Sequence, residues 1–319
     1  MWCLRAILVK DMTLEPLQPE VTVAQYLASR EHDCAESTVR DHRYRLKQFL
    51  VWADEIGLDD MNDLTGRDCE QFKNWRITEC DINQLTLENH LRTFRVFVRW
   101  CESVDAVTEG TADKIIIPRL SKGEKTKEVH IESEQAAKII DYLCRFEWAT
   151  TTHIVFHTLF HTGVRRGELH GLDTEDWHST DGYLSVRHRP ETDTPLKLKN
   201  EGERNINLSD DRLAEALDDY IEHNPHSVTD DHRRSPLLTS KHGRLSAGAI
   251  QHYVYKVTRP CYYGIDCPHG RDEQECEAMT YETYSKCPSS VSPHAIRRSS
   301  IVHHLNQDMP KPCGQMGIY

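Results

Sequence analysis

The sequence predicts a mainly α-helical protein with one small antiparallel sheet (an α+β fold), arranged in two domains. Residues 22–107 repeat apolar side chains at the three- and four-residue spacing of helices. Residues 108–130 follow neither a helical nor a strand period and contain Gly, Pro, Ser and several lysines, which is typical of a linker. Between residues 183 and 208 lie short runs with strand character and an Asn-Glu-Gly turn signal.

Four helices are expected in the first domain. Thr22 is predicted to cap the first, Ser37 to begin a second that ends at Ile56, Thr65 to precede a third and Thr86 to cap a fourth. The polar face of the second helix carries four basic residues: Arg40, Arg43, Arg45 and Lys47. From the residues alone, this face is either a DNA-binding surface or an ordinary solvated one.

The second domain is expected to begin with two helices, over 133–146 and 151–160, the second of which ends at Gly163. A short helix over 165–171 follows, and Glu168 is expected to orient Arg165 through an ion pair. Further along, strands are predicted at 183–188, 194–198 and 204–208, and helices at 211–222 and 247–258.

Composition restricts the function classes. No apolar run approaches the roughly 18 residues of a membrane span, and residues 1–11 lack the cleavage site of a signal peptide. Met12 is a candidate start of translation beside Met1. The net charge of −12 argues against a broadly basic DNA-binding protein, although a DNA-binding face needs positive charge only locally. Such an acidic surface would also suit a cytoplasm with a very high salt concentration. The eleven unevenly spaced cysteines indicate a reducing, cytoplasmic location.

Two segments carry the candidate chemistry, TGVRRGEL at 162–169 and SPHAIRR at 292–298. Arg165 follows a Thr-Gly turn at the start of a helix. His294 and Arg297 are three residues apart, which places them about 5 to 6 Å apart on one helix face. Guanidinium groups bind phosphate oxygens in a bidentate way, and imidazole transfers protons near neutral pH. Surface arginines and a capping histidine are the alternative interpretation.

These two segments resemble the signatures of the tyrosine recombinase (phage integrase) family, and the resemblance extends over about residues 22–306. It implies an N-terminal extension at 1–21, a helical SAM-like core-binding domain at 22–107, a linker at 108–130 and a catalytic domain at 131–319. It also implies site-specific DNA recombination or integration by strand breaking and rejoining, without a catalytic metal or cofactor. The implied partners are double-stranded DNA and, in a homotetramer, further copies of the chain, with no membrane.

The resemblance also implies roles for individual residues. Arg165 and Arg297 would stabilise the charge on the phosphorane, and His294 would manage a proton. A hairpin lysine, Lys197 or Lys199, would serve the leaving 5′-oxygen. The two lysines would share one face of a strand, so alternation does not choose between them, and the Thr-Pro-Leu-Lys context favours Lys197. The basic face of the second helix would contact DNA.

A cysteine-rich insertion at 260–288 is not part of the family pattern. Its potential metal ligands follow the spacing C-x5-C-x-H-x6-C-x10-C: Cys261, Cys267, His269, Cys276 and Cys287. Four such ligands in a polar loop predict a structural zinc site. The expected set is Cys267, Cys276 and Cys287 with either His269 or Cys261. Free cysteines in a disordered insertion are the alternative.

The C-terminal segment departs from the family pattern. The family has a further His or Trp and then the tyrosine nucleophile, whereas this sequence has neither His nor Trp after Asn306 and ends at Tyr319. Tyr319 is not expected to be the nucleophile, which stays unassigned. We therefore expect a truncated or frame-shifted end, with DNA binding retained and strand cleavage impaired. The alternative is a non-catalytic protein that occupies recombination sites.

Overall fold

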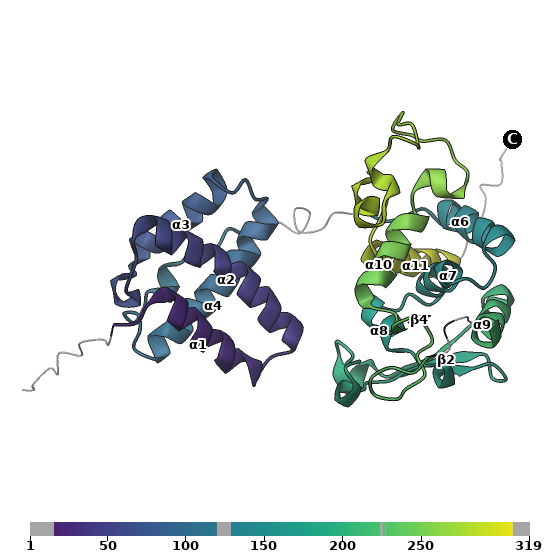
Figure 1. Cartoon of the computed structure of the whole chain (residues 1–319), viewed down its shortest axis with the longest axis horizontal. Helices are drawn as coiled ribbons and strands as arrows, with labels where there is room; N and C mark the ends of the chain where they lie inside the picture. The colour runs from purple at the N-terminus through teal and green to yellow at the C-terminus, as the bar shows by residue number, and fades with distance from the viewer. Residues whose placement is uncertain (1–15, 120–128, 224–225, 227, 309–319) are drawn as a thin grey trace, which may run out of the picture. The chain divides into compact units, whose positions relative to one another are not determined.

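The computed structural model describes residues 16–119, 129–223, 226 and 228–308 (Figure 1). The chain divides into two compact units, with the boundary between Lys127 and Glu128. Each unit has its own hydrophobic core. None of the helices in the described ranges is both long and apolar enough to span a membrane.

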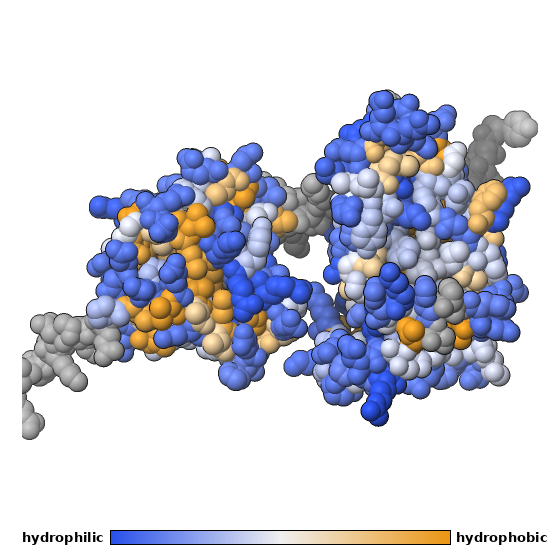
Figure 2. All heavy atoms as spheres, in the orientation of Figure 1, coloured by the Kyte–Doolittle hydropathy of each residue, from blue (hydrophilic) through white to orange (hydrophobic). Residues whose placement is uncertain are grey.

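The first unit is a bundle of four helices: α1 (Pro19–Glu31), α2 (Glu36–Ile56), α3 (Gly66–Thr78) and α4 (Gln84–Ser103). Aromatic rings from α2, α3 and α4 fill its centre, where Phe94 lies 4.9 Å from Phe49 and 4.8 Å from Phe72 between ring centroids. Tilted ring contacts of this kind add stability to the burial of the rings themselves. Figure 2 shows hydrophobic side chains gathered on the visible face of this unit.

Three helix starts in the first unit differ from the prediction, and the smallest difference is in α2, which begins at Glu36 after Ala35, one residue before the predicted Ser37. Helix α1 begins at Pro19, because the fixed φ of proline suits the first helical position, and Thr22 lies inside the helix with its hydroxyl donating to Gln18 O at 2.7 Å. Asn83 caps α4, since its side chain accepts from the Thr86 amide at 2.8 Å. The predicted capping residues Thr22 and Thr86 therefore lie inside α1 and α4, and Pro19 and Asn83, which come earlier in the chain, set the helix starts.

The predicted linker is partly structured. Residues 108–119 pack on the first unit, where Ala112 and Ile115 are buried in the core and a 3-10 helix spans Ala112–Lys114. The Ala112 amide donates to Glu102 Oε1 at 2.6 Å, which fixes this segment to α4. The first part of the linker predicted at 108–130 therefore belongs to the first unit. Residues 120–128 lie outside the described part of the chain.

The second unit is built around a buried helix, α7 (Thr151–Thr162), in which every residue from 152 to 160 is buried. A helix that is enclosed on all sides must be covered by several elements. The covering helices are α6 (Ser133–Phe146), α8 (Arg166–Gly171), α9 (Asp211–His223), α10 (Ala247–Val257) and α11 (Pro293–Asp308). Figure 1 shows α7 in the middle of this unit.

A three-stranded antiparallel sheet lies beside these helices, in the order β1 (Trp177–His178), β2 (Tyr183–Val186) and β3 (Arg204–Asn207). Leu184 of β2 faces Ile206 of β3 in the register. A separate hairpin is formed by β4 (Thr239–Ser240) and β5 (Gly243–Arg244). The sheet brings β3 next to the helical core.

The strand predicted at 194–198 is absent, and β2 pairs directly with β3. Of this segment, only Thr194 forms an isolated bridge, to Arg189. Pro195 has no amide hydrogen to donate to a strand ladder, and Leu196 instead turns into the core while its amide donates to His188 Nδ1 at 2.9 Å. The segment is consequently a loop that leads through a 3-10 helix at Lys199–Gly202 into β3.

The cysteine-rich insertion packs against α10 as three short 3-10 helices: Pro260–Tyr263, Glu277–Met279 and Tyr281–Lys286. The ring of His252 on α10 stacks on Tyr281 at 4.2 Å between centroids. The insertion is thus an ordered part of the second unit, and it ends shortly before α11.

Candidate active site

The turn between α7 and α8 places Arg165 beside Glu168. Gly163 ends α7 in the left-handed conformation, with φ of 60°, as predicted. The Arg165 amide donates to Glu168 Oε2 at 2.8 Å, and Arg165 Nη1 donates to Glu168 Oε1 at 2.8 Å. One carboxylate therefore holds both the backbone and the guanidinium of Arg165.

Two further arginines reach the same carboxylate. Arg204 on β3 donates from Nη2 to Glu168 Oε2 at 2.7 Å, and Arg297 Nη1 on α11 lies 4.0 Å from that oxygen. Arg297 also donates to the carbonyl oxygen of Gly163. We call Arg165, Arg204, Arg297 and Glu168 the arginine cluster. It joins the two sequence motifs with a residue from the sheet.

Burial is uneven within the arginine cluster. The Glu168 side chain is 2% exposed, whereas those of Arg165 and Arg204 are 34% and 35% exposed. Burial alone would raise the pKa of Glu168, but hydrogen bonds from Arg204 and Arg165 outweigh it, so the pKa lies below its usual value. The carboxylate is thus ionised at neutral pH, and the accessible side of the cluster carries positive charge.

The excess of positive charge distinguishes the arginine cluster from a second ionic network in the same unit. That network balances three arginines against three carboxylates: Arg189, Arg234, Arg244, Asp173, Asp176 and Asp230. Three guanidiniums face a single carboxylate in the arginine cluster. A balanced network holds loops together, whereas an unbalanced, half-exposed one can accept an anion with two or more charged oxygens.

The remaining predicted catalytic residues lie close in sequence to two members of the cluster, Arg297 and Arg204. His294 is exposed in the first turn of α11, one turn before Arg297. Lys197 and Lys199 are both exposed in the loop that leads to Arg204. The alternation argument fails for these lysines, because they do not share a strand and Lys199 has a φ of 50° at the start of a 3-10 helix.

Sequence reasoning did not identify Arg204. The residue belongs to no motif, and its contact with Glu168 arises when β2 pairs with β3. The sequence held only a weaker signal: the first motif contains an acidic residue, Glu168, that can pair with more than one arginine. Long-range pairing, which the sequence does not display, decides which arginine completes the cluster.

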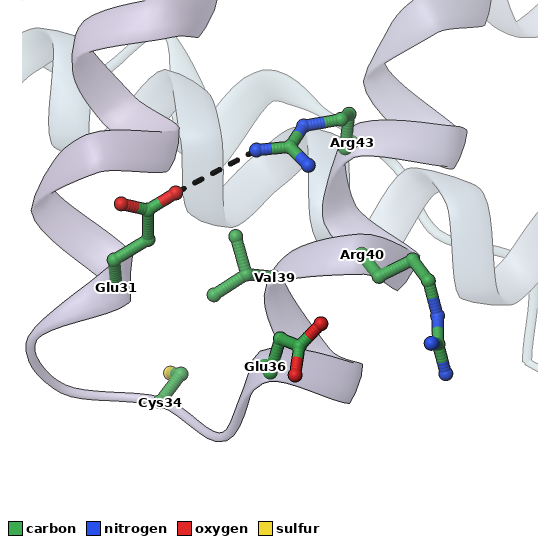
Figure 3. Close-up of a pocket in the computed structure, with 6 residues that line it drawn as sticks. All are labelled: Glu31, Cys34, Glu36, Val39, Arg40 and Arg43. Carbon is green, nitrogen blue, oxygen red and sulfur yellow. Dashed lines mark ion pairs between the residues drawn. The ribbon is translucent and has the colours of Figure 1, made fainter.

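The predicted DNA-contacting residues of α2 differ in availability. Arg40 and Lys47 are exposed. Arg45 donates to Thr93 Oγ1 at 3.0 Å and lies 3.6 Å from Asp41. Arg43 lies 3.6 Å from Glu31, as the dashed line in Figure 3 marks. The Arg43 side chain is still 62% exposed in this surface ion pair, whereas that of Arg45 is 27% exposed and is held by its own unit.

A pocket of about 270 Å³ lies between α1 and α2, lined by Glu31, Cys34, Glu36, Val39, Arg40 and Arg43. Figure 3 shows Arg43 directed towards Glu31 across the pocket and Arg40 directed away from it. Two carboxylates oppose the two guanidiniums here. The pocket therefore lacks the positive excess of the arginine cluster.

The five predicted metal ligands line one small cavity of about 20 Å³ in the insertion. Their donor atoms are not at coordination spacing: in the described part of the chain, the three-ligand group within 4.8 Å is a different one, Cys144, His153 and His157. The nine described cysteines, including those of the insertion, are free of disulfides.

In the group formed by Cys144 on α6 with His153 and His157 on α7, hydrogen bonds already occupy the nitrogen atoms of both histidine rings. The Ala149 amide donates to His153 Nδ1 at 3.2 Å, so the neutral ring carries its proton on Nε2 and donates it to His157 Nδ1 at 3.2 Å. His157 Nε2 donates in turn to Asp210 Oδ2 at 3.0 Å. A metal on His153 Nε2 would move that proton to Nδ1, against the Ala149 amide. Burial lowers the pKa of both rings to about 4, which keeps them neutral.

Comparison with known proteins identifies the class to which this fold and site belong. Residues 130–313 match the phage integrase family, and residues 23–105 match the N-terminal SAM-like domain of phage integrases. The chain therefore belongs to the phage integrase family of tyrosine recombinases, as TGVRRGEL and SPHAIRR predicted. A search of curated protein sequences found no match.

Solved structures of integrases share the fold. The Tn1549 transposon integrase in complex with a circular intermediate DNA has a TM-score of 0.66 at 15% identity, over 92% of this chain and 88% of that chain. A lambda integrase dimer bound to a COC′ core site has a TM-score of 0.62 at 14% identity, over 92% and 72%. A lambda integrase tetramer bound to a Holliday junction has a TM-score of 0.62 at 14% identity, over 92% of this chain and 74% of that chain. The predicted α+β fold with a SAM-like first domain is thus confirmed.

Proposed function

We propose that this chain carries out site-specific DNA recombination by breaking and rejoining DNA strands at a phosphodiester bound to the arginine cluster. The observation that carries the proposal is the charge imbalance around Glu168, where three guanidiniums from the α7–α8 turn, β3 and α11 face one buried carboxylate. A phosphodiester offers two non-bridging oxygens to such a group. Family membership supports the choice of DNA as the phosphodiester.

Arg165 and Arg297 are the proposed ligands of the non-bridging oxygens. Their charge would stabilise the additional negative charge of the pentacoordinate phosphorane more than that of the bound diester, which lowers the barrier. Arg204 would act through Glu168, by holding the carboxylate that orients Arg165. This arrangement separates two arginines that touch the phosphate from one that positions them.

Proton transfer completes the proposed reaction. A tyrosine hydroxyl would attack phosphorus and lose its proton with help from His294, which gives a 3′-phosphotyrosine. The departing 5′-oxygen would receive a proton from Lys197 or Lys199, which leaves a free 5′-hydroxyl. The hydroxyl of a second strand would then reverse the sequence. Tyr319 lies outside the described residues and the nucleophile is not assigned. The impaired strand cleavage expected from the sequence therefore stays a prediction, which the yield of covalent adduct in the experiment below tests.

Double-stranded DNA and further copies of this chain are the proposed partners. The lambda integrase tetramer on a Holliday junction and the other DNA complexes with this fold support both. Arg40 and Lys47 on α2 supply exposed positive charge for backbone contacts. The proposed strand chemistry uses no metal or cofactor, so the zinc that the insertion predicts would be structural.

Covalent trapping on DNA tests the proposal. Duplexes that bind the full-length protein would be selected from a random pool, then prepared with a nick beside the selected site so that a cleaved end is lost. We expect a protein–DNA adduct that survives denaturing electrophoresis. Arg165→Lys and Arg297→Lys should each reduce the rate of adduct formation by roughly 100-fold or more while DNA is still bound, whereas the exposed Arg145→Lys should not.

The outcome without an adduct is also informative. Specific binding without any adduct would favour a protein that occupies recombination sites without cleaving them. If no duplex is bound in preference to the starting pool, the proposal of site-specific action on DNA is wrong.

A further inference from the structure

The cysteine-rich insertion contains a cavity whose size suits one ion. Four cysteines border it from four separate positions along the insertion: Cys261, Cys267, Cys276 and Cys287. The cavity volume is about 20 Å³, which is close to the space that one water molecule needs. An organic ligand does not fit, and water would find few partners among thiols. A single soft cation is the occupant that matches both the volume and the sulfur lining.

A buried arginine at this cavity lacks a carboxylate partner in the described structure. Arg259 is 4% exposed and lines the cavity. Its contacts are neutral: Nη1 donates to Ala278 O at 2.6 Å and lies 3.0 Å from Met279 Sδ, and the guanidinium lies 4.6 Å from the centre of the Tyr284 ring. A buried cation is costly without an anion. Thiolates gathered on a metal would supply that anion.

His269 differs from the four cysteines in its exposure and in its hydrogen bond. The histidine is exposed and its Nε2 shares a hydrogen bond with Ser289 Oγ at 2.8 Å, whereas Cys287 is buried and the other three cysteines are half-buried. Four thiolates complete a tetrahedral zinc site without an imidazole. The alternative group, Cys144 with His153 and His157, is already satisfied by the proton arrangement described above.

We infer that Cys261, Cys267, Cys276 and Cys287 bind one structural zinc ion as four thiolates, with Arg259 compensating their negative charge. Zinc–sulfur bonds of about 2.3 Å would draw the four sulfurs together from their wider spacing, and each thiol would lose its proton to solvent on binding. Four thiolates and Zn²⁺ leave a net charge of −2, which a nearby guanidinium stabilises.

The inferred ion would fasten the segment that leads into α11. Cys261 follows α10, and Cys287 precedes Pro293 at the start of α11. The Val291 amide already donates to Thr258 Oγ1 at 3.0 Å, which ties the two helix ends at one point. A metal between Cys261 and Cys287 would add a second tie. The inference is independent of the recombination chemistry, because the ion takes no part in strand cleavage.

Metal analysis of the full-length protein, prepared without a polyhistidine tag, tests the inference. We expect about one zinc per chain by inductively coupled plasma mass spectrometry. Replacement of zinc by cobalt should give the visible absorption of tetrahedral cobalt with a strong sulfur charge-transfer band. Cys276→Ser should lose most of the zinc, while the matched Cys80→Ser and the non-ligand His269→Ala should keep it.

Affinity and folding controls keep the inference falsifiable if a cysteine variant misfolds. Arg259→Gln leaves all four sulfurs in place and should bind zinc roughly 10- to 100-fold more weakly in a chelator competition. Zinc should also protect four thiols from alkylation in the folded protein. Absence of zinc in the wild type, loss of zinc in Cys144→Ser but not in Cys276→Ser, or an unchanged affinity in Arg259→Gln would each overturn the assignment.

Discussion

Replacement of Glu168 by Gln would remove the charge that holds the arginine cluster together while keeping the side-chain shape. Glu168 accepts three hydrogen bonds at 2.7 to 2.8 Å, one from the Arg165 amide and two from guanidiniums. A glutamine has one oxygen, so one guanidinium would face an NH2 group and lose its bond. We therefore expect both lower stability and lower activity.

The magnitude follows from burial and charge. Breaking a buried ion pair by removal of one partner costs about 3 to 5 kcal/mol. Because the Arg165 and Arg204 side chains are about one third exposed, water compensates part of the loss, and the expected cost is near the lower limit, about 3 kcal/mol. Hydrogen exchange at the Leu169 amide, which donates to Arg165 O at 3.0 Å, measures the opening of α8 directly.

The exposed Glu215 on α9 provides a matched control. Glu215→Gln should change the free energy of opening by less than about 0.5 kcal/mol. Glu168→Gln should also form covalent DNA adducts at least about tenfold more slowly, because Arg165 is no longer held in place. Equal exchange rates in Glu168→Gln and wild type would refute the claim that this carboxylate orients the cluster.

Three further outcomes are expected. Gly163→Ala should lower the free energy of unfolding of the second unit by about 1 to 2 kcal/mol in urea titrations, since φ is +60° and a Cβ would lie 3.0 Å from Ser300 Oγ; an unchanged midpoint would contradict this. The free energy of unfolding should fall as pH decreases from about 6.5 to about 4, because His153 and His157 take up protons at a higher pH in the unfolded chain than in the folded one. The loss is on the order of 3 kcal/mol for each histidine and is absent above about pH 6.5. His157→Gln should show a shallower decline, and a decline as steep as that of the wild type would contradict this. Arg204→Gln should slow adduct formation less than Arg297→Gln does while leaving the same pH profile, and equal loss in both would assign Arg204 to the phosphate itself.

The sequence predicted best where a signal and its partner lie close together in the chain. Gly163 ends α7, and α3 begins directly after Thr65, as predicted, because glycine conformation and helix capping depend on neighbouring residues. The pairing of Glu168 with Arg165 is likewise an interaction three residues apart. Such interactions need no knowledge of the fold.

Features that depend on distant pairing could not be predicted. Arg204 meets Glu168 because β2 pairs with β3, and the strand expected at 194–198 is replaced by a loop whose Leu196 fills the core. Cys144 and His153 lie together only after α6 packs on α7. Through the family resemblance, the two sequence motifs did imply that Arg165 and Arg297 share one site, and Arg297 reaches the α7–α8 turn by donating to Gly163 O.

Arg165 and Arg297 are proposed to neutralise the charge of a DNA phosphodiester. A duplex with a methylphosphonate at the scissile position, which has no negative charge there, tests it most directly. We predict that Arg297→Ala is strongly impaired in forming an adduct with the ordinary phosphate but recovers most of the wild-type rate on the methylphosphonate. Equal impairment on both duplexes would contradict the account, because the arginine would then have a role other than charge neutralisation.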